Sequence, residues 1–404
     1  NRMVLKLWIK GGSRSDPYGK KGIHQILGST ICRGCGPYNN NQVAEIVENA
    51  GSILSCETYE DGLLLSLKCI NNDAFKLIPI IGWMITKPLL EVDQIELEKN
   101  LTINAIKRQK ESSYQQAFDG WRKMIFNEGP YGHDSLGTIS NLNSIKKKHI
   151  IPLANSLIKR KKKLVISGSL PNNIDEYLNT SKAFKVDKEN VIQDINSNQK
   201  NASNELLIKQ KTNICTHYLN TEQVVFLLGK ATISYKNQSD ILLRLISCYL
   251  GCGMSSFLFK VLREKHGVVY ETGVYHPIRE YKTPFIMHAS TTENKALFTI
   301  KLLQQCWEEI INNEIPTEEL NLAKIKYKGQ MAHSLQSISQ RAERKAHLLG
   351  LGLESNHDEK ILMRLESISS KEIQNAAKLY LKDPSLSICG KEGIVNQIKN
   401  EWNK

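Results

Sequence analysis

The chain has 404 residues, 41% of them hydrophobic and 24% charged, which is typical of a globular protein with two or three domains. No apolar run reaches the roughly 18 residues that a membrane-spanning helix needs. The formal net charge is +13, which is compatible with an acidic partner protein. A nucleic-acid site would also need stacking aromatics within a basic patch, and none is expected. The densest basic run, residues 159–163, leads into an apolar stretch and is interpreted as the solvated end of a buried strand.

The nine cysteines are odd in number and scattered along the chain, which argues against a disulfide framework and for a reducing compartment. Cys32 and Cys35 form a C-x-x-C pair without a second pair at metal-binding spacing, so both are interpreted as structural. We therefore expect a soluble, cytoplasmic protein. The sequence begins at Asn1 rather than at a methionine, so an N-terminal segment can be missing and the compartment stays open.

The first half begins with an alternating strand at residues 3–9, followed by helices from about residues 21 and 41. Two strands, at 52–54 and 63–67, follow with Asp61-Gly62 at the turn between them. A long helical region is then expected over residues 92–126 and a strand over 163–168.

The stretch 194–203 is polar, rich in Asn and Ser, and has no periodicity, as a linker would be. After it a similar order of elements returns. Strands are expected at residues 221–228, 268–275 and 284–288, and helices at 294–308, 316–335 and 339–349. The sequence thus predicts two similar α+β domains, residues 1–200 and 201–404, each an antiparallel-rich sheet packed against helices.

Several segments, in order along the chain, resemble the insulinase/pitrilysin family of zinc metallopeptidases, and more closely its mitochondrial-processing-peptidase-like branch. The similar segments are Gly12-Ser13-Arg14-Ser15-Asp16-Pro17, Gly19-Lys20-Lys21-Gly22, Gly132-His133-Asp134-Ser135-Leu136-Gly137-Thr138, Gly251-Cys252-Gly253-Met254-Ser255-Ser256, Leu262-Arg263-Glu264-Lys265, Gly267, Tyr270 and Gln340-Arg341-Ala342-Glu343-Arg344. The resemblance covers most of the chain. It implies one half of a clamshell that closes around a peptide, with the other half supplied by a second chain.

The same resemblance predicts that the zinc site is lost. Active members carry H-x-x-E-H on the helix after the glycine that matches Gly22, with both histidines on one helical face and a glutamate as general base. Here Gln25 and Ser29 occupy the histidine positions and Gly28 that of the base. The distant third ligand falls on Ala105. None of these side chains is an effective zinc ligand or base.

The sequence leaves two alternative metal sites. His24 could replace a ligand if the alignment shifted by one, but Gly28 would then be its partner. A dispersed three-histidine site remains open in principle, although no two of the ten histidines lie within five residues of each other. His24 is interpreted as a helix or interface residue and His133 as a structural hydrogen-bond donor.

Arg263 and Tyr270 match an arginine and a tyrosine that, in the family, contact the bound peptide and stabilise the oxyanion formed when water attacks its carbonyl. The neighbouring Gly251, Gly253, Ser255 and Ser256 are expected to form a substrate-binding loop. The resemblance therefore implies a non-catalytic, substrate-binding subunit with Arg263 and Tyr270 acting in trans. Zinc is expected on a partner subunit of the same family, and the substrate is an extended peptide. The alternatives are an inert scaffold of the same fold and a self-sufficient peptidase with an unconventional metal site.

Overall fold

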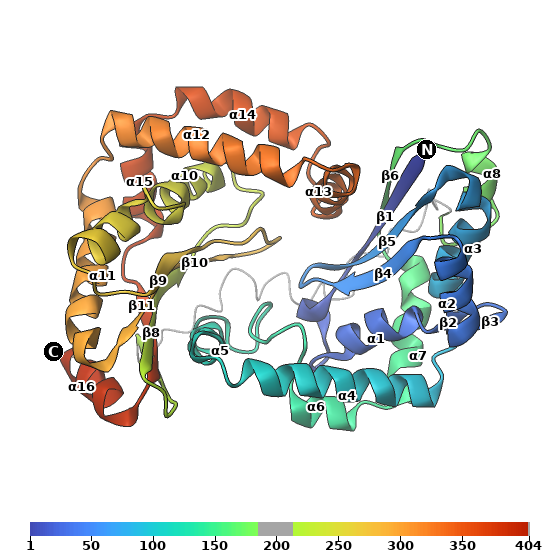
Figure 1. The fold of residues 1–404 in the computed structure, drawn as a ribbon, viewed down its shortest axis with the longest axis horizontal. Coiled ribbons are helices and arrows are strands. Elements are labelled where there is room, and N and C mark those ends of the chain that lie inside the picture. The colour runs from blue at the N-terminus through green and yellow to red at the C-terminus, as the bar shows by residue number, and fades with distance from the viewer. Residues whose placement is uncertain (185–212, 403–404) are drawn as a thin grey trace. The chain divides into compact units, whose positions relative to one another are not determined.

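The computed structural model describes residues 1–184 and 213–402 (Figure 1). The chain divides into two compact units, and each draws on both halves of the sequence. Unit 1 contains Asn1–Lys107, His133–Ala202 and Ser334–Ser355, and unit 2 contains Arg108–Gly132, Ser203–His333 and Asn356–Lys404. The expected linker at residues 194–203 lies outside the described residues. The expected domain boundary near residue 200 lies there as well.

Unit 1 is built on a four-stranded antiparallel sheet of order β4-β5-β1-β6. The strands are β1 (Arg2–Lys10), β4 (Ile53–Thr58), β5 (Gly62–Ile70) and β6 (Lys162–Gly168). Alternation of side chains along β1 sends Met3, Leu5, Leu7 and Ile9 to one face, where they join the main hydrophobic core of the unit. The strands expected from the sequence are therefore confirmed, with β4 and β5 longer than expected.

The helices of unit 1 supply the rest of this core. They are α1 (Ile23–Ile31), α2 (Asn40–Asn49), α3 (Ala74–Thr86), α4 (Val92–Gln109), α6 (Ile139–Ser144), α7 (Lys147–Ser156) and α8 (Ile174–Asn179), with a small ribbon of β2 (Gly34–Cys35) and β3 (Tyr38–Asn39). Helix α3 was not expected, because it is apolar on nearly every side and therefore lacks the periodicity by which helices are recognised.

The second face of this sheet is covered by α13 (Ile338–Gly350), a helix from the last third of the chain (Figure 1). Its Ala342 and Ala346 pack against a smaller cluster that includes Val4 and Trp8. Within this layer Lys6 is only 2% exposed, and its ammonium donates to Glu343 Oε2 at 2.6 Å and to Ser66 Oγ at 2.9 Å. A lysine buried on the central strand thus depends on α13 for its counter-charge.

Unit 2 has a five-stranded sheet of order β7-β11-β8-β10-β9, antiparallel except for the β7–β11 pair. The strands are β7 (Ile214–Tyr218), β8 (Gln223–Ala231), β9 (Glu271–Tyr275), β10 (Pro284–Thr292) and β11 (Ser385–Gly390). The helices are α10 (Asp240–Gly251), α11 (Ala296–Asn312), α12 (Thr317–Ser334), α14 (His357–Ser367), α15 (Ser370–Tyr380) and α16 (Glu392–Trp402), and a π-helix spans Phe259–Lys265. The large core of the unit lies between these helices and one face of the sheet.

The other face of this sheet is covered by α5 (Ser113–Phe126), a helix from the first third of the chain. Phe118 and Trp121 of α5 pack with Leu227 and Ile286 of the sheet. The indole of Trp121 also donates to the carbonyl of Ser385 at 3.3 Å. Each sheet is therefore closed by one helix from the opposite half of the sequence.

The helical region expected over 92–126 is present with these bounds, and it is divided into two helices: α4 (Val92–Gln109) ends before α5 starts at Ser113. The break occurs because the Ser112 hydroxyl accepts a hydrogen bond from the Gln115 amide and begins a new helix. The predicted fold class, α+β with antiparallel-rich sheets packed against helices, is confirmed. Within the described residues, no helix is long and apolar enough to cross a bilayer.

Candidate functional site

Helix α1 carries three of the four degenerate metal-site positions, and its start is fixed by glycine. Gly22 has φ of 96°, and a β-carbon there would lie 2.6 Å from the carbonyl oxygen of Leu136. Gly137, with φ of 82°, packs against Gly22 from the other side, its missing β-carbon 2.2 Å from Lys21 O. Only glycine permits this close contact between the loop at residue 137 and the start of α1.

The side chains on α1 do not offer a metal site. The Ser29 hydroxyl lies 3.0 Å from the carbonyl oxygen of Gln25 and donates to the helix backbone. At Gly28 the space for a side chain is already occupied, since a β-carbon would lie 2.6 Å from Thr58 Oγ1. A glutamate at position 28 would have to displace Thr58.

The fourth position, Ala105, is on α4 and has no donor atom. Two helical turns before it, Glu98 accepts hydrogen bonds from Arg33 at 2.8 Å from Nε and 2.6 Å from Nη2. Glu98 is thus neutralised by an arginine rather than directed at an ion. No three His, Cys, Asp or Glu side chains within residues 1–184 and 213–402 are grouped so that they could hold a metal. The residues present do not fit zinc, and no hydrolytic step follows from them.

A buried hydrogen-bond network surrounds the start of α1 instead. The carboxylate of Asp16 accepts from the Gly22 amide at 2.5 Å, from His24 Nδ1 at 2.7 Å and from His133 Nε2 at 3.1 Å. On the other side of His24, its Nε2 lies 3.1 Å from Arg160 Nη1, which also donates to the Gly11 carbonyl at 2.7 Å. His24 and His133 are therefore structural, as interpreted from the sequence.

The contacts of His24 determine its protonation. A guanidinium can only donate, so Nε2 accepts from Arg160, and the single proton is on Nδ1 facing Asp16. Burial lowers the pKa of His24, and its hydrogen bond to Asp16 only partly opposes this. Burial raises the pKa of Asp16, but hydrogen bonds from His133 and His24 outweigh burial and hold that pKa below its usual value. His24 is therefore a neutral imidazole that donates a hydrogen bond to the carboxylate of Asp16.

The network corrects the interpretation of the basic run 159–163. Arg160 is half-buried and bonded within the network, and Lys162 donates to the carbonyl of Ile158 at 2.5 Å. Only Lys159, Lys161 and Lys163 are exposed. Sequence reasoning missed Arg160 because its partner His24 is 136 residues away.

The C-x-x-C cysteines sit beside α1 but are inert as thiols. Burial raises the pKa of Cys32 to about 12 and that of Cys35 to about 12. The Cys35 thiol points to the carbonyl of Ile80 at 3.6 Å. Neither thiol has the electropositive, accessible surroundings that a reactive cysteine needs.

The structure brings Arg263 and Tyr270 together in unit 2. Arg263 Nη1 donates to the main-chain carbonyl of Tyr270 at 2.7 Å, and both side chains are at the surface, with Tyr270 63% exposed. Arg263 lies in the π-helix Phe259–Lys265, a conformation that is rare and frequent at functional sites. Gly267, with φ of 59°, makes the turn between the two residues.

The predicted glycine loop reaches the same strand. Tyr270 immediately precedes β9, and Gly251 at the end of α10 packs so closely on β9 that a β-carbon would lie 2.7 Å from the Val274 nitrogen. Gly253 has φ of 76° and faces open space, Ser255 is exposed and Ser256 is buried. Arg263, Tyr270 and the loop therefore converge on β9, an edge strand.

Comparison with known proteins gives the class of this fold. Residues 2–138 match the family model described as insulinase (peptidase family M16), and residues 170–327 match the model described as the peptidase M16 inactive domain. The crystal structure of a peptidase M16 inactive domain from Pseudomonas fluorescens superposes with a TM-score of 0.82 at 16% identity, covering 96% of this chain and 93% of that one. The chain belongs to the insulinase (M16) family.

Its relatives carry differing names. An uncharacterized zinc protease of Rickettsia bellii is 20% identical over 406 residues, 98% of this chain and 93% of the relative. The non-peptidase homolog YmxG of Helicobacter pylori is 20% identical over 391 residues, 93% and 85% of the two chains. The mitochondrial-processing peptidase subunit beta of Saccharomyces cerevisiae is 23% identical over 142 residues, 35% and 31% of the two chains. The predicted family and its processing-peptidase-like relatives are thereby confirmed.

Proposed function

We propose that this chain is the non-catalytic, substrate-binding subunit of a two-chain zinc peptidase. It supplies Arg263 and Tyr270 to a site whose zinc is held by a partner subunit of the same family. The observation that carries the proposal is the pairing of Arg263 with the Tyr270 carbonyl at the surface of unit 2. The positions that would bind metal in unit 1 hold no donor set, so zinc has to come from elsewhere.

The paired residues have the chemistry that the role requires. The hydrogen bond at 2.7 Å from Nη1 fixes the guanidinium while its other N–H groups remain available. The exposed phenol of Tyr270 is a second donor. A guanidinium and a phenol directed at a peptide carbonyl stabilise the negative charge that develops there when water attacks.

An extended peptide is the substrate class that best fits the surroundings. β9 begins directly after Tyr270 and pairs only with β10 among the described strands. An edge strand offers main-chain donors and acceptors to a peptide that adds alongside it. One relative's name, subunit beta of a processing peptidase, supports an assembly of two chains, and another's, non-peptidase homolog, supports an inactive member.

The test uses the chain assembled with a zinc-bearing family member and a quenched-fluorescence peptide. Arg263→Ala and Tyr270→Phe should each lower kcat/KM of the assembled pair about tenfold or more, since each removes a donor to the transition state. Size-exclusion chromatography should show unchanged assembly. Lys265→Ala, which removes the same charge from an exposed position on the same π-helix, is the matched control and should leave turnover intact. Unchanged turnover in both test variants would overturn the proposal.

The second candidate is an inert scaffold, and one observation favours it. Arg263 already satisfies a backbone carbonyl of its own chain, which is a sufficient structural reason for an arginine at this position. A scaffold predicts that Arg263→Ala lowers the thermal stability of the chain and changes no turnover. Tyr270→Phe separates the two candidates, because the phenol hydroxyl is at the surface and its removal should not affect stability.

A further inference from the structure

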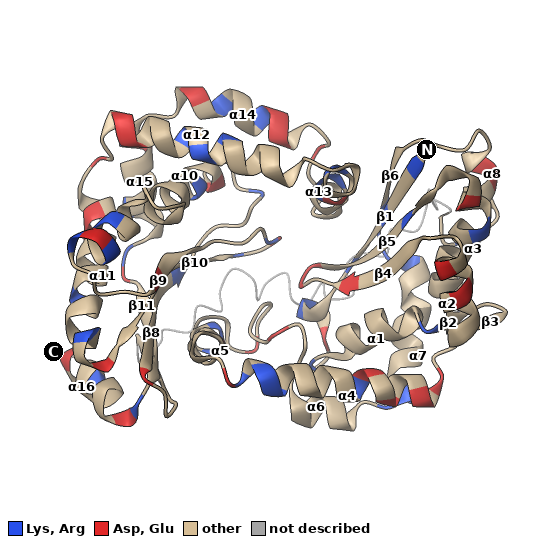
Figure 2. Ribbon diagram, in the orientation of Figure 1, with Lys and Arg blue, Asp and Glu red and all other residues tan. Residues whose placement is uncertain are grey.

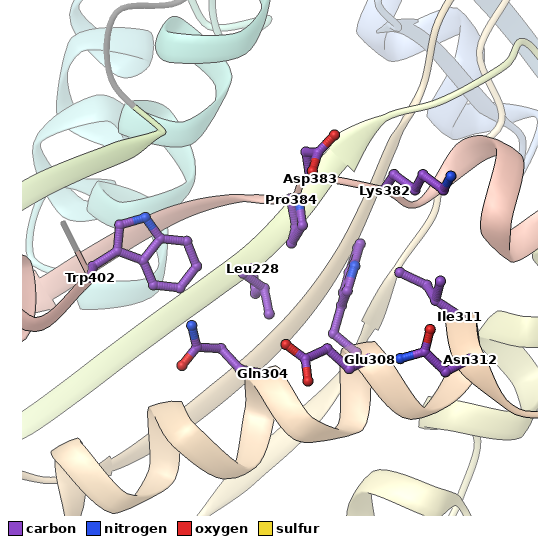
Figure 3. A pocket seen from close by; sticks show the side chains of 10 residues that line it. Leu228, Gln304, Glu308, Ile311, Asn312, Lys382, Asp383, Pro384 and Trp402 are labelled. Atoms are coloured by element: carbon purple, nitrogen blue, oxygen red, sulfur yellow. The ribbon is translucent and has the colours of Figure 1, made fainter. Parts of the chain in front are cut away.

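Unit 2 contains a cavity of about 390 Å³ between α11, α16 and the segment that leads into β11 (Figure 3). Its volume is in the range of small-ligand sites. It is lined by Leu228 of β8, by residues of α11, by Lys382–Pro384 and by Trp402 at the end of α16. Neither Arg263 nor Tyr270 lines it, so it is separate from the proposed substrate contacts.

The walls of the cavity are held in place by main-chain contacts. Trp307 is 2% exposed, and its indole N–H donates to the carbonyl of Leu381 at 2.8 Å. Lys230 donates to the carbonyl of Lys382. Asp383 has φ of 55°, a left-handed conformation that turns the chain into β11. The segment opposite α11 is thus fixed rather than free to fill the cavity.

Three polar side chains of α11 line this cavity: Gln304 is half-buried, and Glu308 and Asn312 are exposed at its rim. Gln304, Glu308 and Asn312 are four residues apart and share one helical face. Within the described part of the chain, none of the three side chains makes a hydrogen bond or an ion pair. In Figure 3, Gln304 lies on the side of the cavity where Trp402 is found, and the carboxylate of Glu308 lies nearer its middle.

The combination of an indole, a carboxylate and two amides suits a guanidinium group in particular. An indole face attracts a cation, and a guanidinium stacks on it better than an ammonium because it is planar and weakly hydrated. A carboxylate accepts two parallel hydrogen bonds from a guanidinium, and amide oxygens can accept the remaining N–H groups. Ile311, which is half-buried, adds apolar contact for the methylenes of the side chain.

The charged residues at the rim of the cavity are compatible with a bound guanidinium group. Asp383 contributes a second negative charge, and the ammonium of Lys382 points away from Glu308 (Figure 3). We propose that this cavity binds the side chain of an arginine residue of a peptide, with Trp402 as the stacking surface and Glu308 as the carboxylate partner. This binding goes beyond the proposed function and does not depend on it.

The test titrates the full chain with Nα-acetyl-L-arginine amide, followed by calorimetry and by tryptophan fluorescence. Saturable binding is expected, and Glu308→Gln should weaken it about tenfold, in line with the loss of a charge-assisted hydrogen bond. Glu309→Gln is the matched control: it removes the same charge from the next residue of α11, which does not line the cavity, and should bind as the natural chain does. Nα-acetyl-L-citrulline amide, equal in shape but uncharged, should bind at least tenfold more weakly.

Three results would overturn the assignment. They are no saturable binding to the natural chain, equal weakening by Glu308→Gln and Glu309→Gln, and equal binding of the citrulline compound. The second would mean that the arginine compound responds only to the overall charge of the protein. Because no partner subunit or peptidase activity enters this experiment, its failure leaves the proposed function standing.

Discussion

At the residue scale, Ser29 and Gly28 of α1 have no free group and no free space for a zinc site. The hydroxyl of Ser29 is used by the helix backbone, and the space at Gly28 is taken by Thr58. On the alignment that the resemblance implies, a zinc site would require new donors at Gln25, Ser29 and Ala105 together with room for a base at Gly28. No single substitution would supply all of these.

His347 provides a measurable consequence of burial in unit 1. Its ring stacks on Trp8 with centroids 4.7 Å apart, in the layer between β1 and α13. Burial lowers the pKa of His347 to about 4, and the nearby charge of Arg344 adds to the effect. The folded chain therefore holds this imidazole neutral at a pH where the unfolded chain would protonate it.

The contribution of His347 to the free energy of unfolding should decrease as the pH falls. The unfolded state binds a proton below about pH 6.5 and the folded state only below about pH 4, so stability from this residue is present above pH 6.5 and is lost as pH falls between these values. His347→Phe keeps the aromatic stack but cannot titrate. Between pH 7 and pH 5 the natural chain should lose about 2 kcal/mol more of its unfolding free energy than the variant. Urea denaturation at both pH values measures the difference, and equal losses would contradict the assignment.

At the scale of elements, the unexpected feature is the pair of helices that close the second face of each sheet. Periodicity indicates that α5 and α13 each have an apolar side, but it does not indicate which sheet that side covers. Ala342 and Ala346 of α13 meet Val4 and Trp8, more than 300 residues away along the sequence. Only the folded chain shows this pairing.

Much of the remaining architecture could be predicted, because it is local. The strand at 3–9 is a short run of apolar residues interrupted only by Lys6, the turn at Asp61-Gly62 joins β4 to β5, and Gly251 ends α10. The assignment of Gln25, Gly28 and Ser29 as degenerate metal positions rests on one short motif and stays a prediction. The network of Asp16, His24, His133 and Arg160 could not be predicted, because it joins the segment 16–24 to residues more than 100 positions further along the chain.

The helices from opposite halves of the sequence lead to a prediction about fragments. A fragment of residues 1–200 would lack α13, leaving Val4, Trp8 and Leu64 uncovered and Lys6 without Glu343. Exposure of each such apolar side chain costs about 1.5–3 kcal/mol, and an unpaired buried lysine costs more. The fragment alone should show no cooperative thermal transition by circular dichroism.

The control for this experiment is the same fragment co-expressed with residues 201–404, which supply α13 and the sheet that α5 covers. The two fragments together should recover a cooperative transition. A cooperative transition with native-like near-ultraviolet signal for residues 1–200 alone would show that α13 is dispensable for unit 1.

For the whole molecule, the features that bear on function are divided between the two units. Unit 1 has α1, on which the resemblance places a degenerate metal site, with Arg33 bonded to Glu98 and with Asp16 bonded to His24 nearby. Unit 2 has the exposed Arg263–Tyr270 pair beside an edge strand. A shared active site, as proposed, would need one subunit to contact the substrate and the other to hold the metal.

The charge of the whole molecule does not point to a different function. Lysine and arginine occur on many elements of both units, with acidic residues interspersed among them (Figure 2), and the net charge of +13 is spread over 404 residues. A positive chain of this kind is attracted to acidic partners over a range that salt shortens. Assembly with a zinc-bearing subunit is therefore best measured at more than one ionic strength.

The most direct measurement is peptidase activity on a broad quenched-peptide library with added zinc, for the purified chain alone and for its mixture with a zinc-bearing M16 subunit. We expect no cleavage by the chain alone, and cleavage by the mixture that exceeds that of the zinc-bearing subunit by itself and is abolished by a chelator. Chelator-sensitive cleavage by the chain alone would contradict the interpretation of Gln25, Gly28, Ser29 and Ala105. A mixture no more active than its zinc-bearing member would contradict the shared site and favour the scaffold.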